Sequence, residues 1–248
     1  MTSPVQVKIC GLRRIEDAYA AVQAGADYLG FILALGSPRT ITPEELAALR
    51  RGIDLGATRI VGVVRDQPAA WINDAVRSCG LDYVQLHGHE PRDFAAALAV
   101  PVLRVVRLRG ATGAARVEVA RPAARLDAEG AMRGALAPAG LPPNVFAVLF
   151  DAETAAGQSG GLGLRPDAGA LAAARAALPD ATRVFLSGGL TPENVALAVR
   201  TIRPFAVDVS SGVEHSPGKE VSSGLEHSPG IKDAARIAAF VAAAKGAL

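Results

Sequence analysis

A thiol and a carboxylate each follow a predicted strand in this chain, where either could move a proton. Cys10 lies in Lys8-Ile9-Cys10-Gly11, and Asp151 follows the apolar run Val145–Phe150. A thiol acts as a base or a nucleophile once its pKa falls from about 8.5. A carboxylic acid serves as a general acid when partial burial raises its pKa. We predict an acid–base pair; a small buried hydrophobe and a structural loop aspartate are the alternatives for Cys10 and Asp151.

Two glycine- and serine-rich turns in the last third of the chain have the composition of an anion site. One is Ser187-Gly188-Gly189, and the other is Asp208-Val209-Ser210-Ser211-Gly212. Glycines let backbone N–H groups approach an anion closely, and serine hydroxyls add neutral donors. These turns predict a phosphate site, with ordinary tight turns as the alternative.

Three further polar side chains lie near predicted strand ends. Arg39, in Ser37-Pro38-Arg39, could bind a carboxylate with its planar guanidinium, although a surface arginine is an equal alternative. Gln85 and His87 alternate with apolar neighbours and therefore share one face of a strand. They either line the mouth of a barrel or cap its interior.

Neither a metal nor a nucleotide cofactor is expected. His215 and His227 each lie in Glu-His-Ser-Pro-Gly, and no other residues supply metal ligands at a suggestive spacing. The dinucleotide pattern Gly-x-Gly-x-x-Gly does not follow the first predicted strand.

Short apolar runs that alternate with Ala- and Leu-rich amphipathic segments must position these residues. Near-continuous apolar runs are typical of parallel strands that are buried on both faces. The polar residues gather at the C-terminal ends of the runs, as in a (β/α)8 barrel, whereas a doubly wound open sheet would bring fewer loops to one centre. We predict a single barrel domain over residues 1–248. The predicted strands are Val5–Ile9, Tyr28–Leu33, Arg59–Val64, Tyr83–Leu86, Val102–Val106, Val145–Phe150, Arg183–Leu186 and Phe205–Val209.

Several helix starts and ends are also readable. Thr42-Pro43-Glu44-Glu45 predicts a capping box with Pro at the first helical position, and Thr191-Pro192 predicts a similar start. Gly25 is placed to end the first helix. The apolar face predicted for that helix comprises Ile15, Ala18, Tyr19 and Val22.

Two segments interrupt the regular pattern. Leu108–Asn144 is long for a connection between two strands and predicts an extended connection between the fifth and sixth predicted strands. The segment from Asp208 to Ile231 is a tandem repeat, because the copy that starts at Asp208 recurs from Glu220 with a period of 12 residues. One unit is far shorter than a solenoid repeat, so we interpret 208–231 as a duplicated loop whose second copy is the insertion.

The composition limits the partners. The chain of 248 residues is 50% hydrophobic and carries a net charge of +2. Arg116–Arg133 is arginine-rich but has no interleaved aromatic residues, so no nucleic-acid surface is expected. The two cysteines fit a reducing compartment. With neither a signal peptide at the N-terminus nor a membrane-spanning apolar stretch, we expect a cytoplasmic protein with a phosphorylated small-molecule partner, as a monomer or homodimer.

In order along the chain, these motifs resemble those of the phosphoribosylanthranilate isomerases. The first and last pieces together, in this order and spacing, are highly specific to that family. The similar pieces are Val7–Gly11, Gly25–Phe31, Ser37–Arg39, Val84–Gly88, Leu149–Asp151, Leu186–Val195 and Arg203–Glu214.

The resemblance implies a cofactor-free Amadori rearrangement of N-(5-phosphoribosyl)anthranilate in tryptophan biosynthesis. On the family pattern, Asp151 is the general acid that opens the furanose ring. Cys10 is the general base that removes the C2 proton, and Arg39 holds the anthranilate carboxylate. The expected phosphate cradle comprises Gly188, Gly189, Ser210 and Ser211. Lys8, Gln85, His87, Asp208 and Gly212 complete the expected substrate-binding set.

Two segments differ from the family pattern. Gly160–Leu164 reads Gly-Gly-Leu-Gly-Leu where the family usually has Gly-Gly-Ser/Thr-Gly-Lys, and Ala34-Leu35-Gly36 replaces a common aromatic–proline pair. A different phosphate-barrel isomerase or epimerase is one alternative, but it would need an aspartate base or metal-binding histidines. A non-catalytic barrel that binds a phosphorylated metabolite is the other.

Overall fold

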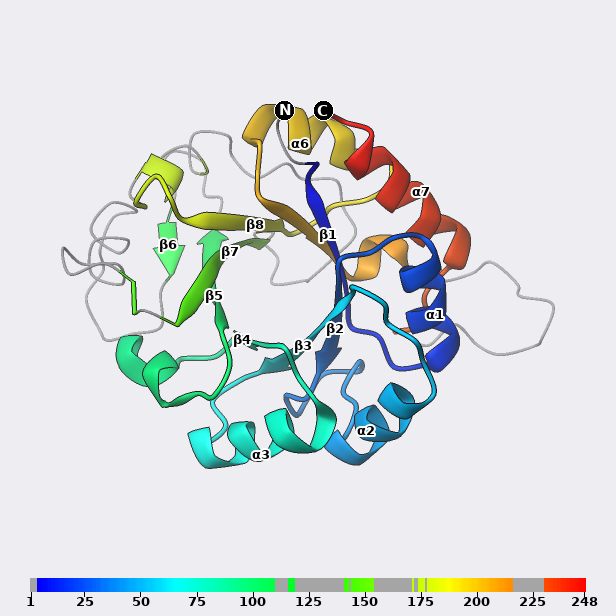
Figure 1. Ribbon diagram of the computed structural model, residues 1–248. Coiled ribbons are helices and arrows are strands. Elements are labelled where there is room, and N and C mark those ends of the chain that lie inside the picture. The colour runs from blue at the N-terminus through cyan, green and yellow to red at the C-terminus, as the bar shows by residue number, and fades with distance from the viewer. Residues whose placement is uncertain are drawn as a thin grey trace.

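The predicted apolar runs form eight parallel strands that close into a barrel (Figure 1). The computed structural model describes residues 4–109, 116–118, 141–142, 144–153, 171, 174–176, 178–215 and 230–248. Around the barrel the order is β4-β3-β2-β1-β9-β8-β7-β5, and β4 pairs with β5 to close the ring. The strands are β1 (Gln6–Cys10), β2 (Tyr28–Ile32), β3 (Arg59–Val64), β4 (Tyr83–Leu86), β5 (Val102–Arg109), β7 (Val145–Glu153), β8 (Arg183–Ser187) and β9 (Ala206–Val209).

Each of the eight predicted runs corresponds to one strand of the barrel, which confirms the fold class. The short strand β6 (Arg116–Glu118) was not predicted, and it pairs antiparallel with the end of β5. It belongs to the predicted Leu108–Asn144 connection, most of which lies outside the described residues. The strand expected at Val145–Phe150 is therefore labelled β7.

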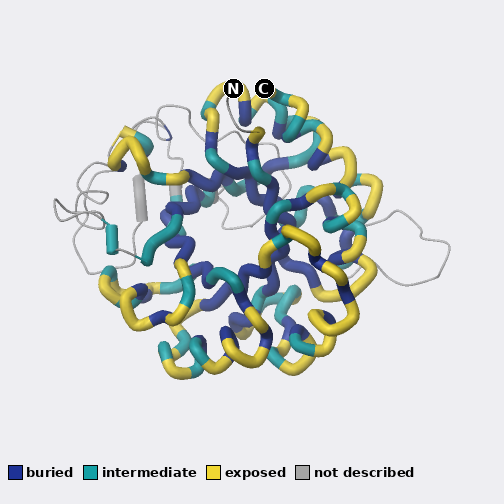
Figure 2. The backbone as a smooth tube through the Cα atoms, viewed as in Figure 1, coloured by how far each residue is buried: buried dark blue, intermediate teal, exposed yellow. Residues whose placement is uncertain are grey.

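The interior of the barrel is filled near the N-terminal ends of the strands. A buried cluster there draws its members from the strands alone and includes Tyr28, Leu103 and Phe185. The rings of Tyr28 and Phe185 meet edge to face, with their centroids 5.3 Å apart. A larger cluster lies between the strands and the surrounding helices, whose outer faces are exposed (Figure 2). The interior is packed at the N-terminal ends of the strands, so the polar residues lie at the C-terminal ends, where (β/α)8 barrels carry their sites.

Helices connect most of the strands and surround the barrel (Figure 1). The capping box is confirmed: Thr42 Oγ1 accepts from Glu45 N at 3.2 Å, and the Glu45 carboxylate accepts from Thr42 N at 2.8 Å. In the described part of the chain, no helix combines the length and the apolar character that crossing a bilayer requires. The helices are α1 (Ile15–Gln23), α2 (Pro43–Arg51), α3 (Ala69–Cys79), α6 (Val195–Ile202) and α7 (Ala234–Lys245), with 3₁₀ turns η1 (Arg92–Ala97) and η2 (Ser211–Val213).

The predicted start of α6 is wrong. The helix begins at Val195 rather than at Pro192. The Asn194 side chain accepts from Thr191 N at 2.9 Å and donates to Gly189 O at 2.9 Å. These two bonds hold residues 191–194 in a turn, which delays the helix.

The predicted buried face of α1 is confirmed for Ala18 and Val22 and wrong for Ile15 and Tyr19. Ala18 is fully buried and Val22 packs against the core, whereas Ile15 and Tyr19 are 38% and 58% exposed. Ala21, which was not predicted, is fully buried, and small side chains on this face let α1 pack closely against α7. Gly25 follows α1 with a φ of +85°, as its predicted position at the helix end requires.

Replacing Thr42 by Ala should lower the free energy of unfolding by about 1 kcal/mol, because the first turn of α2 loses its side-chain acceptor. Urea denaturation would measure this loss. Thr42→Ser keeps the hydroxyl, so its free energy of unfolding should stay within a few tenths of a kcal/mol of the wild-type value. Equal losses in both variants would contradict a capping role.

Candidate active site

A buried ion pair lies beneath the mouth of the barrel, between the first and last strands. Lys8 Nζ lies 2.9 Å from Asp208 Oδ1, and their side chains are 0% and 6% exposed. Burial lowers the pKa of Lys8, but Asp208 and Cys10 outweigh it, so the pKa is raised. Sequence reasoning placed both residues among the substrate contacts. In the structure the two side chains contact each other below the surface, and their contact with a substrate stays a prediction.

Cys10 ends β1 directly above this pair and is buried. Burial raises the pKa of the Cys10 thiol, Asp208 raises it further, and the cations Lys8 and Lys232 oppose the shift. The net direction is upward, whereas catalysis by a thiolate calls for a lowered pKa. A base at this position therefore depends on the balance between burial and two nearby ammonium groups.

Gln85, His87 and Asp151 form a line across the site. Gln85 Nε2 lies 3.1 Å from His87 Nδ1, and His87 Nε2 lies 3.6 Å from Asp151 Oδ2. With the amide donating to Nδ1, the imidazole carries its proton on Nε2, facing the carboxylate. Gln85 is only 2% exposed and its amide contacts the His87 ring, while its predicted contact with a substrate stays a prediction.

His87 is a neutral group at physiological pH. Burial lowers its pKa, the cations Arg107, Lys8 and Arg65 add to the effect, and the pKa falls to about 4. The side chain of Asp151 is 21% exposed and lies within β7 rather than after it. A neutral imidazole can direct its Nε2–H at the Asp151 carboxylate without forming a full ion pair with it.

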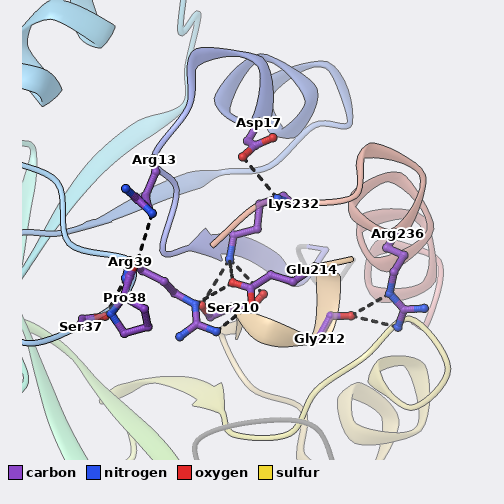
Figure 3. Close-up of polar contacts among 10 residues, drawn as sticks. All are labelled: Arg13, Asp17, Ser37, Pro38, Arg39, Ser210, Gly212, Glu214, Lys232 and Arg236. Carbon is purple, nitrogen blue, oxygen red and sulfur yellow. Dashed lines mark hydrogen bonds and ion pairs between the residues drawn. The ribbon is translucent and has the colours of Figure 1, made fainter. Parts of the chain in front are cut away.

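Arg39 meets a carboxylate from its own chain (Figure 3). Its Nε and Nη2 donate to the two oxygens of Glu214 at 2.6 and 2.8 Å. Lys232 Nζ donates to Glu214 Oε1 at 2.8 Å and to the Ser210 carbonyl at 3.1 Å. Burial alone would raise the pKa of Glu214, but its bonds and charges from Arg39 and Lys232 lower it to about 2.

Sequence reasoning gave no role to Glu214 and did not identify Lys232. Glu214 was part of a quoted motif, but nothing in the sequence paired it with Arg39. Lys232 lies 18 residues further along, beyond the duplicated segment. Only the antiparallel bridge between Glu214 and Lys232 brings the two together. The motif Pro-Gly-Ile-Lys at the end of the second repeat copy is the one sequence signal that could have pointed to Lys232, and it is weak.

The two turns expected to bind phosphate lie against each other. Gly188 and Gly189 follow β8 with positive φ values of 97° and 64°, which L side chains rarely adopt. A Cβ on Gly212 would lie 1.9 Å from the Leu190 carbonyl oxygen, so only glycine fits between the turns. Ser210 follows β9, and Ser211 begins η2. Backbone and hydroxyl donors from both turns thus gather at one edge of the mouth.

Some sequence predictions lie outside the described residues. These are the Gly160–Leu164 segment, His227 and most of the second repeat copy, including Ser223. The beginning of the first copy, residues 208–215, is described and continues β9 into the turn. In the part of the chain that is described, no three His, Cys, Asp or Glu side chains gather as potential metal ligands.

The lowered pKa of His87 predicts a pH dependence of stability. Between pH 6.5 and pH 4 the unfolded chain takes up a proton that the folded site excludes, so unfolding becomes easier as the pH falls. Replacing His87 by Asn should reduce the loss of stability between pH 7 and pH 4 by about 1 kcal/mol, after allowance for solvent screening. Urea denaturation at several pH values would measure it; identical pH profiles would contradict the burial of a neutral imidazole.

Comparison with known sequences shows which family the chain resembles. The family profile described as N-(5'phosphoribosyl)anthranilate (PRA) isomerase matches residues 7–220. The chain is 38% identical over 243 residues to the N-(5'-phosphoribosyl)anthranilate isomerase of Geobacter sulfurreducens, covering 98% of this chain and 99% of the relative. Identity to the isomerase of Symbiobacterium thermophilum is 41% over 241 residues, covering 97% and 98%.

Solved structures agree with the sequence comparison. The phosphoribosyl anthranilate isomerase of Thermotoga maritima is 32% identical, with a TM-score of 0.74, and the match covers 98% of this chain and 99% of that one. An isomerase in complex with reduced 1-(o-carboxyphenylamino)-1-deoxyribulose 5-phosphate is 31% identical, with a TM-score of 0.71 and the same coverage. The chain therefore belongs to the N-(5'-phosphoribosyl)anthranilate isomerase family.

Proposed function

We propose that the chain catalyses the Amadori rearrangement of N-(5-phosphoribosyl)anthranilate to 1-(2-carboxyphenylamino)-1-deoxyribulose 5-phosphate in tryptophan biosynthesis. The observation that carries the proposal is the position of Cys10 and Asp151, a thiol and a carboxylate on different strands at the same end of one family barrel. The reaction moves protons only, so acid and base groups of the chain suffice without a cofactor.

Asp151 is the proposed general acid. It gives a proton to the furanose ring oxygen, the C1–O bond breaks, and the nitrogen lone pair forms a protonated Schiff base at C1. His87 Nε2, 3.6 Å from Asp151 Oδ2, orients the carboxyl group. Gln85 holds the imidazole ring from its other side. Because the pKa of His87 is about 4, the imidazole stays neutral and leaves proton donation to Asp151.

Cys10 is the proposed general base. Its thiolate removes the proton from C2, the C–H electrons form a C1=C2 double bond, and the C=N electrons return to nitrogen. The resulting enolamine then takes a proton at C1 and releases the proton of its C2 hydroxyl, which gives the ketose. Lys8 and Lys232 both favour the thiolate against the effect of burial. The cationic Schiff base, once formed beside Cys10, shifts the balance in the same direction.

The protein recognises the two ends of the substrate, the anthranilate carboxylate and the phosphate. Arg39 binds the anthranilate carboxylate, for which its planar guanidinium is suited. The phosphate lies in the turns after β8 and β9, where glycine backbone and serine hydroxyl donors gather. Lys8 and Asp208 support Cys10 from below. The proposed cradle comprises Gly188, Gly189, Ser210, Ser211 and Gly212.

The organisation of the protein follows from the same geometry. We propose one barrel domain over residues 1–248, because the described strands form one sheet and α7 packs on β1. A monomer or a homodimer could carry the site, since one chain supplies all of its residues. A reducing compartment such as the cytoplasm would keep Cys10 a free thiol.

Removing the acid or the base should abolish most of the activity. Cys10→Ala and Asp151→Asn should each lower kcat at least about a hundredfold, because acid–base groups contribute about 10²–10⁴-fold. Anthranilate fluorescence, followed while the protein consumes freshly made phosphoribosylanthranilate, would measure turnover. Cys79→Ala, the other cysteine at the end of α3, should retain it.

The outcomes separate the claims. Turnover that survives Cys10→Ala would keep the reaction and remove the general base. A folded wild-type protein without turnover would overturn the isomerase proposal and favour a barrel that only binds phosphorylated metabolites.

The first repeat copy should bind the phosphate. Ser211→Ala should raise the KM about tenfold, because a hydroxyl donor to a charged oxygen is lost. Ser223→Ala, the equivalent change in the second copy, should leave the KM unchanged. Steady-state kinetics of both variants would test this. Equal effects would refute the assignment of the second copy as the insertion.

A further inference from the structure

We propose that Glu214 and Lys232 position Arg39 and thereby set the preference of the site for a substrate with an aryl carboxylate. This inference rests on the proposed function. It gives Glu214 a role, and it gives Lys232 a second role beside its effect on the Cys10 thiol. Figure 3 shows the three side chains converging, with Arg39 from the loop after β2 and Glu214 and Lys232 from the chain beyond β9.

The bidentate bond fixes which edge of the guanidinium is free. Arginine presents five N–H donors in a planar fork. Glu214 takes Nε and one Nη2 donor of Arg39, at 2.6 and 2.8 Å. In the described part of the chain no residue bonds Nη1, so the Nη1/Nη2 edge keeps its donors. That edge has the geometry for a second, incoming carboxylate.

Lys232 keeps the carboxylate of Glu214 from neutralising the site. The Lys232 side chain is 0% exposed and shares Glu214 Oε1 with Arg39, at 2.8 Å from its Nζ. Two cations then face one carboxylate, which leaves one net positive charge on the cluster. A lone Glu214–Arg39 pair would leave none. An anionic substrate group therefore meets an unneutralised charge in a partly buried setting, where it is weakly screened.

Packing holds this arrangement in place. A Cβ added to Gly11 would lie 2.7 Å from Arg39 Cδ, 2.8 Å from Ser210 Oγ and 3.5 Å from Lys232 Nζ. Gly11 directly follows Cys10, so the cluster lies against the proposed base on one side and the phosphate turn on the other. A guanidinium that is already fixed loses little further freedom when it binds a ligand.

A competing role predicts the opposite effect. If Glu214 only occupies Arg39 in the absence of substrate, it competes with the substrate carboxylate. Removing its charge would then tighten binding of carboxylated ligands. If Glu214 positions Arg39, the same change weakens that binding. The direction of the change decides between the two roles.

The test compares two ligands on three proteins. The ligands are reduced 1-(o-carboxyphenylamino)-1-deoxyribulose 5-phosphate and the same compound without its carboxyl group, with Kd values from fluorescence or calorimetric titration. The proteins are wild type, Glu214→Gln and the control Glu193→Gln, whose side chain is 66% exposed and pairs with Arg236. Glu214→Gln should weaken binding of the carboxylated ligand about tenfold and leave the other ligand within about twofold. Glu193→Gln should change neither Kd.

Each other outcome overturns a defined claim. Tighter binding of the carboxylated ligand to Glu214→Gln, or equal weakening of both ligands, would refute the positioning role. A wild type that binds neither ligand would instead refute the proposed function. If Glu214→Gln does not fold, Lys232→Met serves in its place, because it removes the second cation and with it the net positive charge of the cluster. The loss for the carboxylated ligand should then exceed the loss for the other about tenfold, and equal losses would again refute the role.

Discussion

The buried pair of Lys8 and Asp208 is the interaction on which the geometry of the mouth depends. The two residues are register partners where β1 meets β9, so the pair lies on the seam between the first and last barrel strands. Taking two charges out of water is costly, and neither charge is tolerated without the other. A shift of register by one residue would separate them. The pair therefore fixes the height of Cys10, two residues after Lys8, relative to Ser210, two residues after Asp208.

A second set of charges lies above this pair, and Cys10 lies between the two levels. Lys8 acts on the thiol from β1, and Lys232 acts on it from the segment before α7. Both ammonium groups are tied to carboxylates, Lys8 to Asp208 and Lys232 to Glu214. Their partners keep them charged despite burial, at the cost of weakening their effect on the thiol. The resting site therefore favours the protonated thiol, and in the proposed mechanism the cationic Schiff base is the additional charge that favours the thiolate.

The sequence was most informative about elements whose environment is uniform. Strands buried on both faces must be apolar throughout, so their runs predicted the barrel and the strand ends predicted which polar residues meet. The sequence was least informative where tertiary packing decides which side chains are buried and where a helix begins. Tyr19 is exposed because alanines face the barrel, and Asn194 delays α6 through bonds to a neighbouring turn. The burial of Lys8, Gln85 and Asp208 and the position of Lys232 depend on contacts between distant segments, which no local pattern encodes.

The same long-range contacts explain how a barrel can carry a duplicated loop beside its site. Asp233 N donates to Val213 O at 2.9 Å, and His215 N donates to Ile231 O at 3.3 Å, so the chain is clamped where the first copy leaves the turn and where the second returns. The closure entropy of a loop rises by only about 0.6 kcal/mol per doubling of its length. On the interpretation of the second copy as an insertion, twelve added residues between these ends would cost on the order of 1–2 kcal/mol of the stability of the fold. The Glu214–Lys232 bridge holds the two ends together beside the proposed site.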